Sequence, residues 1–389
     1  MYKVLTLIMI VLFSCSKPEI PKDSPKQSVE KPKEIIEQKP EKVFDKSEKI
    51  KRPEFTQGIY LSAWTVATKK FITILDSAEV AGINTVVFDV KNMNGDIFFK
   101  FTGEKEFTGE NIKPILNIEK VIDEIHKRNM RAVARVVMFH DQYLAEYHTE
   151  LRPFKSDGSV WKENSRGKAS WLDSSNENVH KYLFSVIKSV LQFNIDEIQM
   201  DYIRFPTQGK LSDANFLFQK QDNAFSRKDS TYIKREKSDI IEQVVKKVRE
   251  ICDEYEVDLS GDIFAIVAWQ RKVDVRNTGQ DITKLTKYLS AIHPMIYTSH
   301  FNKDFGYRND VWNEPYHLVY KATKQTVEYS KDTCKVIPYI QANSWKVNYK
   351  PEYIYAQIQS IKDCNADGYI LWNASNIYMK TLRWIKDSE

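Results

Sequence analysis

Cysteine is scarce in this sequence. The 389 residues include only four cysteines, Cys15, Cys252, Cys334 and Cys364. Their spacing matches no zinc-binding pattern, and the three that follow Cys15 are an odd number, which cannot form a complete set of disulfides. We expect Cys252, Cys334 and Cys364 to be small buried residues, with one disulfide open to them in an oxidising compartment.

A membrane span is also missing at the start of the chain, because the apolar run at residues 1–14 is shorter than the roughly 20 residues that a helix needs to cross a bilayer. With Lys3 near its start, the run is typical of a signal peptide. Its end, Leu12-Phe13-Ser14-Cys15, resembles the lipobox of bacterial lipoproteins, although Phe13 is less usual there than a small residue. The resemblance implies a leader over residues 1–15, lipidation of Cys15, and export to the periplasmic face of a membrane or the cell surface. The alternative is an ordinary signal peptide.

Residues 16–52 have one aromatic residue, Phe44, together with five prolines, eleven Lys and Arg, and eight Asp and Glu. Such a segment cannot bury enough apolar surface to offset its ordering entropy, so we expect a disordered tether. Residues 53–389 then carry 46 basic and 45 acidic residues. This near balance gives no case for nucleic-acid binding.

A glycine-rich phosphate turn is missing after the first predicted strand, where the chain reads Leu61-Ser62-Ala63-Trp64-Thr65. An open doubly wound sheet usually has such a turn, so that fold is the weaker alternative, and we expect no cofactor. Instead, eight β-rich runs alternate with helical patterns, as in βα units on a parallel sheet. The runs are 58–64, 85–91, 131–139, 197–205, 264–269, 291–297, 336–342 and 368–372. The sequence predicts a single (β/α)8 TIM barrel over residues 53–389. Two long connections, 141–175 and 207–238, follow strands and are either groove walls or surface padding.

The fourth predicted strand is unusual because Gln199 and Asp201 fall on one face of it. Strands of a parallel sheet are buried on both faces, so these polar side chains are costly unless they meet a polar cavity. The strand must end before Pro206, and the carboxyl end of a barrel strand is where this fold places catalytic groups. The alternative is a buried Asp201–Arg204 ion pair that only fixes the loop.

Polar and aromatic residues gather at the ends of the other strands too. Aromatic platforms, amides and an arginine suit a carbohydrate, whose rings stack on aromatic faces while its hydroxyls bind amides and acids. The predicted substrate-binding residues are Trp64, Arg135, Arg204, Tyr297, His300, Gln341, Trp372 and Asn373. The tryptophans could instead be barrel packing, and His300 has no second histidine at ligand spacing, so we expect no metal.

Cleavage of a glycoside needs two carboxyl groups with separated pKa values. We expect Asp201 to be the base or nucleophile, kept ionised by a buried Arg135. Asp262 is the predicted acid and Asp89 the reserve candidate. In the competing interpretation, Asp89 pairs with Lys91 or Arg135 as scaffold and Asp262 is a turn residue.

Several ordered segments resemble the glycoside hydrolase domain family known as domain of unknown function 4015. They are Glu197-Ile198-Gln199-Met200-Asp201-Tyr202-Ile203-Arg204-Phe205-Pro206, Gly58-Ile59-Tyr60-Leu61, Val87-Phe88-Asp89-Val90-Lys91, Ala134-Arg135-Val136-Val137, Ser260-Gly261-Asp262-Ile263-Phe264, His293-Pro294-Met295-Ile296-Tyr297 and Leu371-Trp372-Asn373-Ala374-Ser375-Asn376. The resemblance implies a TIM-barrel glycosidase, secreted or on the surface, acting on a polysaccharide. It departs from the family at Asn92-Met93-Asn94-Gly95, where acidic residues are usual, and at Ala265, where glycine is commoner.

These observations predict a lipid-anchored glycoside hydrolase that cleaves a bacterial cell-envelope or extracellular polysaccharide. A rival interpretation is a glycan-binding surface lipoprotein that keeps the barrel without catalysis. The neutral loop at Asn92–Asn94 favours the rival. A purely structural envelope protein is a third interpretation, and it predicts no glycan affinity.

Overall fold

The computed structural model describes residues 49–389, except 165, 308–309, 332 and 388–389. The predicted leader, the lipidation site Cys15 and residues 16–48 of the predicted tether lie outside the described residues.

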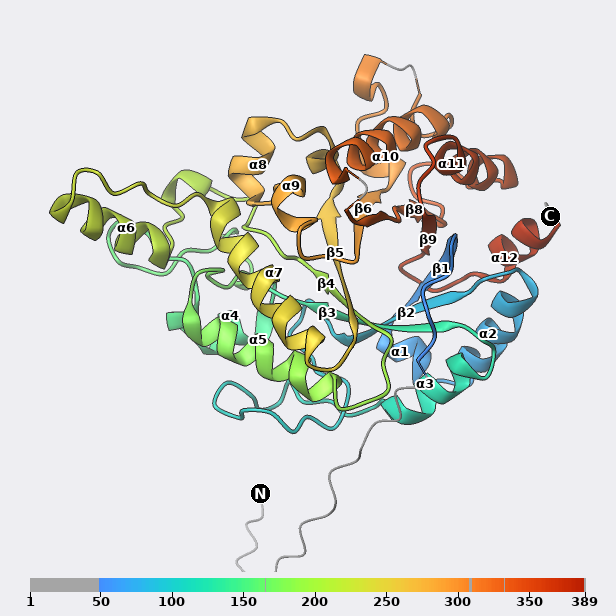
Figure 1. Cartoon of the computed structure of the whole chain (residues 1–389), viewed down its shortest axis with the longest axis horizontal. Coiled ribbons are helices and arrows are strands. Elements are labelled where there is room, and N and C mark those ends of the chain that lie inside the picture. The colour runs from blue at the N-terminus through green and yellow to red at the C-terminus, as the bar shows by residue number, and fades with distance from the viewer. Residues whose placement is uncertain (1–48, 165, 308–309, 332, 388–389) are drawn as a thin grey trace, which may run out of the picture. The chain divides into compact units, whose positions relative to one another are not determined.

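A closed parallel barrel forms the centre of the described chain (Figure 1). Its strands are β1 (Thr56–Leu61), β2 (Thr85–Lys91), β3 (Arg131–Val137), β4 (Glu197–Asp201), β5 (Asp258–Phe264), β6 (Ala291–Ile296), β7 (Lys335–Val336), β8 (Tyr339–Gln341) and β9 (Gly368–Trp372). Each strand pairs in parallel with its neighbour, and the pairing of β5 with β6 closes the ring. Both β7 and β8 pair with β6, so together they fill one position and the barrel has eight. The predicted fold is confirmed.

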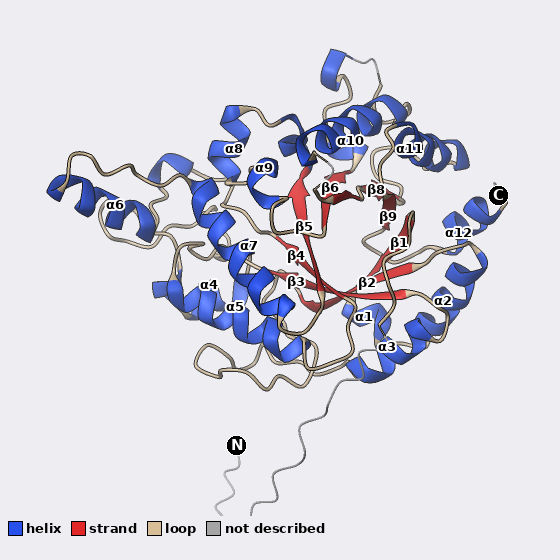
Figure 2. Cartoon of the chain, in the orientation of Figure 1, coloured by secondary structure: helices blue, strands red, loops and turns tan. Residues whose placement is uncertain are grey.

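Helices surround the strands (Figure 2). The outer helices are α2 (Lys70–Val80), α3 (Ile118–His126), α5 (Glu177–Val190), α7 (Lys237–Asp253), α10 (Tyr316–Ser330), α11 (Pro351–Asp363) and α12 (Met379–Lys386). Further helices lie in the connections: α1 (Ala63–Val66), α4 (Gln142–Tyr147), α6 (Leu217–Lys228), α8 (Lys272–Thr278) and α9 (Ile282–Leu285). In α7 the buried residues recur at helical spacing, so the helix lays one apolar stripe on the barrel.

The fifth and seventh strands differ from the prediction. The fifth was predicted at 264–269, but the strand is Asp258–Phe264 and the apolar run that follows is a 3-10 helix, Ala265–Trp269. The strand was not recognised because Ser260 and Asp262, which are buried in the barrel, interrupt the apolar run expected of a parallel strand. The seventh strand is broken between β7 and β8 at Pro338, which has no N–H to donate to a ladder.

A cluster of apolar and aromatic side chains packs in the barrel interior: Tyr60, Val87, Val133, Ala291, Tyr297, Ile337, Tyr339 and Ile370. A larger core packs between the strands and the helices. Because the interior is packed, polar residues on inward positions can reach a ligand only at the carboxyl end of the barrel, where the strands open into loops.

The amino-terminal end of the barrel is closed by charges, some of them from the predicted tether. Arg52 binds Glu197 at 2.8 Å, and the N–H of Ile50 donates to Asp196 at 2.7 Å. Although burial alone raises the pKa of Glu197, Arg52 and Arg131 hold it well below its usual range. The tether boundary predicted at residue 52 is therefore wrong, since residues 49–52 pack against the barrel as part of the folded domain.

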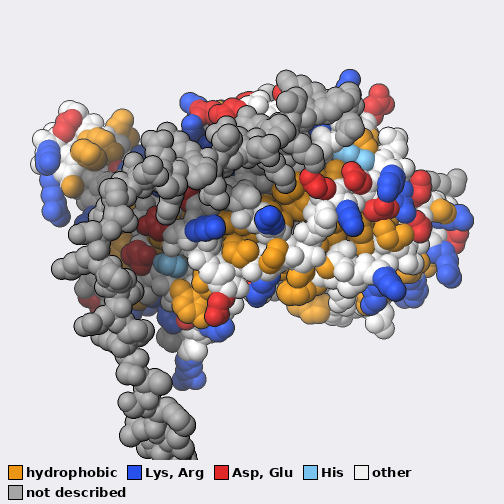
Figure 3. Space-filling view, turned by 90° about the horizontal axis from the view of Figure 1, so that it is seen from below, with side chains coloured by type: hydrophobic (Ala, Val, Ile, Leu, Met, Phe, Trp, Pro, Cys, Tyr) orange, Lys and Arg blue, Asp and Glu red, His pale blue; other side chains and the backbone are white. Residues whose placement is uncertain are grey.

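The remaining features agree with the composition. The described cysteines Cys252, Cys334 and Cys364 are buried and free, so they are small core residues, and the disulfide left open is not formed. On the face drawn in Figure 3, basic and acidic side chains are interspersed. Within the described part of the chain, every helix is too short or too polar to cross a membrane.

Candidate active site

Strand β4 ends abruptly at Asp201 because the next residue, Tyr202, has a φ of 53°. A bulky residue in the left-handed region is strained, and such strain often marks a functional turn. The Tyr202 N–H donates back to Asp201 Oδ1 at 2.6 Å. The turn thus aims the Asp201 carboxylate into the carboxyl end of the barrel and holds one of its oxygens.

Arg135, from the neighbouring strand β3, binds two aspartates at once. Its Nη1 donates to Asp89 Oδ1 at 2.5 Å, and its Nη2 donates to Asp201 Oδ2. The three side chains are at most 7% exposed. The sequence predicted Arg135 beside Asp201 or Asp89, and the structure places it between them. The competing Asp201–Arg204 pair is not formed, and Lys91 pairs with Asp141 at 2.8 Å instead of Asp89.

The pKa of Asp89 is raised above the usual value of an aspartate. Burial raises it, and the opposing effect of Arg135 and of the Tyr60 hydroxyl, which donates to Asp89 Oδ2 at 2.6 Å, does not cancel that rise. The nearby Asp201 carboxylate raises it further. Asp89 therefore holds a proton at a higher pH than an ordinary aspartate.

Asp262 lies on the interior face of β5, beside the same arginine. Gln199 Nε2 donates to its Oδ1 at 2.5 Å, Arg135 Nε is 3.9 Å from its Oδ2, and the side chain is 1% exposed. Burial, followed by the charge of Asp201, raises the pKa of Asp262 well above its usual range. The raised pKa favours the protonated form that a general acid needs. Asp262 does not line the cavity, however, so this geometry does not support its predicted role as the direct acid.

The raised pKa of Asp262 predicts a pH dependence of stability. At a pH between the unfolded and folded pKa values, folding takes up a proton, so this group's stabilisation is lost as pH rises, by about 1.4 kcal/mol per pH unit. Asp262→Asn carries no such proton, so its free energy of unfolding should decline less steeply than that of the wild type from about pH 4 to pH 7. Denaturant titrations at several pH values check this. Parallel curves for the two proteins would contradict it, and the exposed Asp157→Asn is the control.

A cavity of about 900 Å³ opens above the Arg135 cluster. Asp89, Arg135 and Asp201 lie in its lining, together with eight aromatic residues: Tyr60, Trp64, Tyr202, Phe264, Tyr297, Phe301, Phe305 and Trp372. Trp372 stacks on Tyr60 with ring centroids 4.2 Å apart and on Tyr297 at 5.7 Å. Trp64 is 54% exposed at the start of α1. A carboxylate floor between aromatic walls suits a sugar chain.

Two further predicted residues line this cavity. Arg204 lies against the rings of Trp171, Tyr202 and Phe264. His300 packs on Tyr297, and burial together with Lys346 lowers its pKa, which favours the neutral imidazole. In the described part of the chain, no three His, Cys, Asp or Glu side chains come together as a metal site.

Gln341 and Asn373 were predicted to bind substrate, but the structure places both outside the lining of the cavity. Gln341 accepts from the Ser299 N–H at 3.0 Å, and Asn373 donates to the carbonyl oxygens of Ala342 and Ile377. Both side chains therefore brace loops around the barrel mouth, and neither lines the cavity.

Sequence reasoning missed several residues of the site. Tyr60 holds Asp89 and stacks on Trp372, and only its inward position on a short strand hints at this. From the long connections, Thr207 and Gln208 line the cavity, whereas Trp171 only supports Arg204. The neutral loop residues Asn92, Met93 and Asn94 line the cavity as well.

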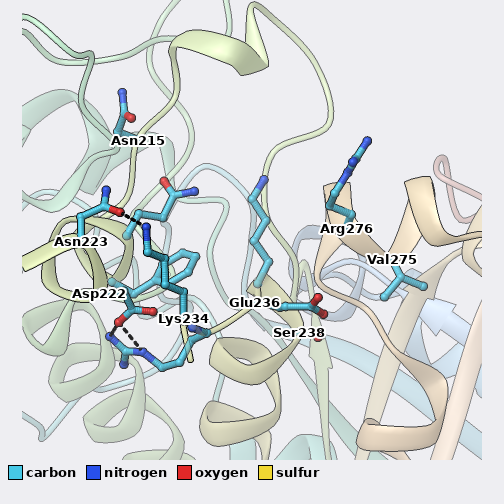
Figure 4. Close-up of a pocket in the computed structure, with 12 residues that line it drawn as sticks. Asn215, Asp222, Asn223, Lys234, Glu236, Ser238, Val275 and Arg276 are labelled. Atoms are coloured by element: carbon cyan, nitrogen blue, oxygen red, sulfur yellow. Dashed lines mark hydrogen bonds and ion pairs between the residues drawn. The ribbon is translucent and has the colours of Figure 1, made fainter. Parts of the chain in front are cut away.

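A second cavity, of about 400 Å³, lies between α6, the start of α7, and α8 (Figure 4). Its polar groups largely satisfy one another, since Arg235 binds Asp222 at 2.7 Å and Lys234 binds Asn223 at 2.7 Å. Asp222 and Glu236 are the two carboxylates in its lining. Because Asp222 is already neutralised by Arg235, we place the candidate active site in the larger cavity.

Comparison with solved structures finds the same fold in carbohydrate-active proteins. The glycoside hydrolase domain of PgaB (BpsB) from Bordetella bronchiseptica is 10% identical, with a TM-score of 0.62, over 85% of this chain and 98% of that one. An endo-1,4-β-D-mannanase from Thermotoga petrophila is 11% identical, with a TM-score of 0.51, over 82% and 88%. A hypothetical protein from Ruminiclostridium thermocellum is 27% identical over 52% and 96%, with a TM-score of 0.43. The first two likenesses establish the barrel fold.

Comparison with curated proteins finds no match. A family model described as "Putative glycosyl hydrolase domain" matches residues 58–378, which include every strand of the barrel but the first two residues of β1. The match also contains Asp89, Arg135, Asp201 and Asp262. The chain therefore belongs to this glycosyl hydrolase domain family, DUF4015.

Proposed function

We propose that the protein is a glycosidase that cleaves a bacterial cell-envelope or extracellular polysaccharide, and that it is exported and lipid-anchored through Cys15. One observation carries the proposed activity. Asp89 and Asp201 share the guanidinium of Arg135 at the floor of an aromatic cavity. Two carboxyl groups beside a bound sugar chain are what glycoside cleavage requires.

The two aspartates take different parts in this reaction. Asp201 accepts hydrogen bonds from Arg135 and from the Tyr202 N–H, which hold its carboxylate in place at the cavity, and we assign it as the nucleophile or general base. Asp89 has the raised pKa and lines the cavity, so it is the general acid that protonates the leaving oxygen. Asp89 thus takes the place of Asp262, which does not line the cavity.

Asp262 keeps an indirect part in this scheme. In its neutral form, Asp262, like the acid Asp89, adds no further negative charge beside Arg135, so the guanidinium balances the Asp201 carboxylate. The test of the scheme is reducing-end release from glycans by residues 49–389, compared with variants of each aspartate. Loss of release in Asp201→Asn and Asp89→Asn, with activity largely kept in Asp262→Asn, supports these assignments. Equal loss in all three would contradict the distinction between Asp89 and Asp262.

The rival function is glycan binding without cleavage. The neutral Asn92, Met93 and Asn94 in the cavity lining favour it. A binder retains affinity for a glycan and releases no new reducing ends, whereas the proposed enzyme releases them.

The proposed anchoring rests on Leu12-Phe13-Ser14-Cys15, which resembles a lipobox. We expect the full chain expressed in a Gram-negative host to incorporate a labelled fatty acid and to fractionate with membranes. Cys15→Ala should abolish the incorporation because the thiol that carries the lipid is removed. Labelling that persists in Cys15→Ala would contradict this assignment, and Cys252→Ala is the matched control.

A further inference from the structure

Arg204 has an unusual environment for a cation. Its guanidinium carbon is 4.7 Å from the ring centroid of Trp171, 5.1 Å from that of Phe264 and 5.2 Å from that of Tyr202. These rings remove water from the guanidinium and fix its plane. Burial accordingly lowers the pKa of Arg204, although an arginine stays charged at neutral pH.

The hydrogen bonds of Arg204 use only one edge of the guanidinium. Nη1 donates to the carbonyl oxygen of Phe205 and to Thr207 Oγ1, both at 3.2 Å. Nε and Nη2 make no hydrogen bond within the described chain. If they were fully buried, they would be buried donors without a partner, and they are not, so solvent reaches them. Since Arg204 lines the large cavity, this open edge is available to a ligand there.

No carboxylate of the described residues comes within 4.0 Å of the Arg204 guanidinium. Asp201, three residues earlier, is taken by Arg135. Glu163 is near enough to raise the pKa of Arg204 but forms no ion pair with it. A cation that lies against aromatic rings and has no carboxylate partner gains from an anion, and the open edge of Arg204 in the cavity gives such an anion a place.

The chemistry of the open edge selects among anions. Nε and Nη2 present two parallel N–H donors, which match the two oxygens of a carboxylate in a bidentate pair. The aromatic rings around Arg204 offer apolar faces on which a sugar ring can lie beside that carboxylate. We propose that the cavity binds an acidic sugar, with the sugar's carboxylate on Nε and Nη2 of Arg204. The inference rests on the proposed function, because it names the substrate class of the same cavity.

The test uses matched pairs of oligosaccharides from bacterial polysaccharides that contain glucuronate or galacturonate. In each pair the second member is carboxyl-reduced, which turns every uronate into a neutral hexose with the same linkage. Binding to residues 49–389 is measured by calorimetry. We expect an acidic member to bind about tenfold more tightly than its reduced partner, or better, and the preference to weaken with salt.

Four variants make the test specific. Arg204→Gln should remove the preference for the acidic member, and Arg204→Lys, which keeps the charge without the two-donor edge, should leave part of it. Glu163→Gln should strengthen the preference, because a carboxylate that competes for the field of Arg204 is removed. Arg383→Gln, at an exposed position of α12, should change nothing. Thermal melting of each variant separates lost binding from lost folding.

The outcomes distinguish this inference from the proposed function. Acidic binding that depends on Arg204 but releases no reducing ends supports the acidic subsite and contradicts the hydrolase. Equal binding and cleavage of both members, unaffected by Arg204→Gln, overturns the acidic subsite and leaves the hydrolase standing. The protein could instead prefer a sulfated glycan to its desulfated form while showing no preference for uronates over their reduced partners. That result overturns the carboxylate assignment. Binding of no glycan at all overturns both.

Discussion

Asp201→Asn is expected to lower kcat/KM for glycan cleavage by about 10³-fold or more. The amide keeps the shape of the side chain and can still accept from the Tyr202 N–H, which donates to Asp201 Oδ1 at 2.6 Å. It cannot act as a nucleophile or a base, so the loss should fall on kcat while substrate affinity changes little. Steady-state kinetics on the cleaved glycan measures both quantities.

The control for this prediction is Asp157→Asn. Asp157 lies in the long connection 141–175, is exposed, and does not line the cavity. It makes the same chemical change and should leave kcat/KM unaltered. If Asp201→Asn retained wild-type turnover while binding glycan normally, Asp201 would be a recognition residue and the roles proposed for the two aspartates would be wrong.

Arg135→Met is expected to destabilise the fold by about 3–5 kcal/mol at neutral pH. The substitution leaves Asp89 and Asp201 buried without their shared cation, and it removes the charge nearest to Asp262. Because Arg135 lowers the pKa of both Asp89 and Asp262, its loss would raise the folded pKa of these two groups further. The stability of the variant should therefore fall more steeply than that of the wild type as pH rises from about 4 to 7.

Denaturant unfolding of the wild type and Arg135→Met at both ends of that pH range measures this difference. Adding Asp89→Asn and Asp201→Asn to Arg135→Met should restore much of the lost stability, because the uncompensated charges are gone. If Arg135→Met were as stable as the wild type at neutral pH, the cluster would not be an ionised network, and the electrostatic account of the site would fail.

The sequence could reveal the barrel because most strands are apolar runs with clear ends. It failed at the fifth strand, where Ser260 and Asp262 break the apolar pattern and the more apolar run after Phe264 forms a 3-10 helix. Periodicity reports burial, and it cannot tell a strand whose polar residues face a packed interior from a loop. For the same reason Asp262 was left with two interpretations, a catalytic acid and a turn residue.

The core of the site was also within reach of sequence reasoning. Asp201 could be recognised because it is an acid on a strand that must be buried. Arg135 could be recognised because it is a charged residue among Ala132, Val133, Val136 and Val137. Side-chain partners were not readable, because they depend on the register of neighbouring strands. Gln341 and Asn373 have the residue types of sugar-binding groups, yet the structure uses them to tie loops. Glu163 comes from a long connection whose path no local pattern fixes.

The measurement that tests the central claim most directly is reducing-end release by residues 49–389 across a panel of bacterial glycans, with binding measured on the same panel. This chain begins at Lys49 because Arg52 and Ile50 anchor the bottom of the barrel. The account predicts that at least one glycan is both bound and cleaved, and that the folded Asp201→Asn binds it without cleaving it. Binding with no release of reducing ends from any glycan by the wild type would contradict the account and identify the barrel as a glycan-binding scaffold.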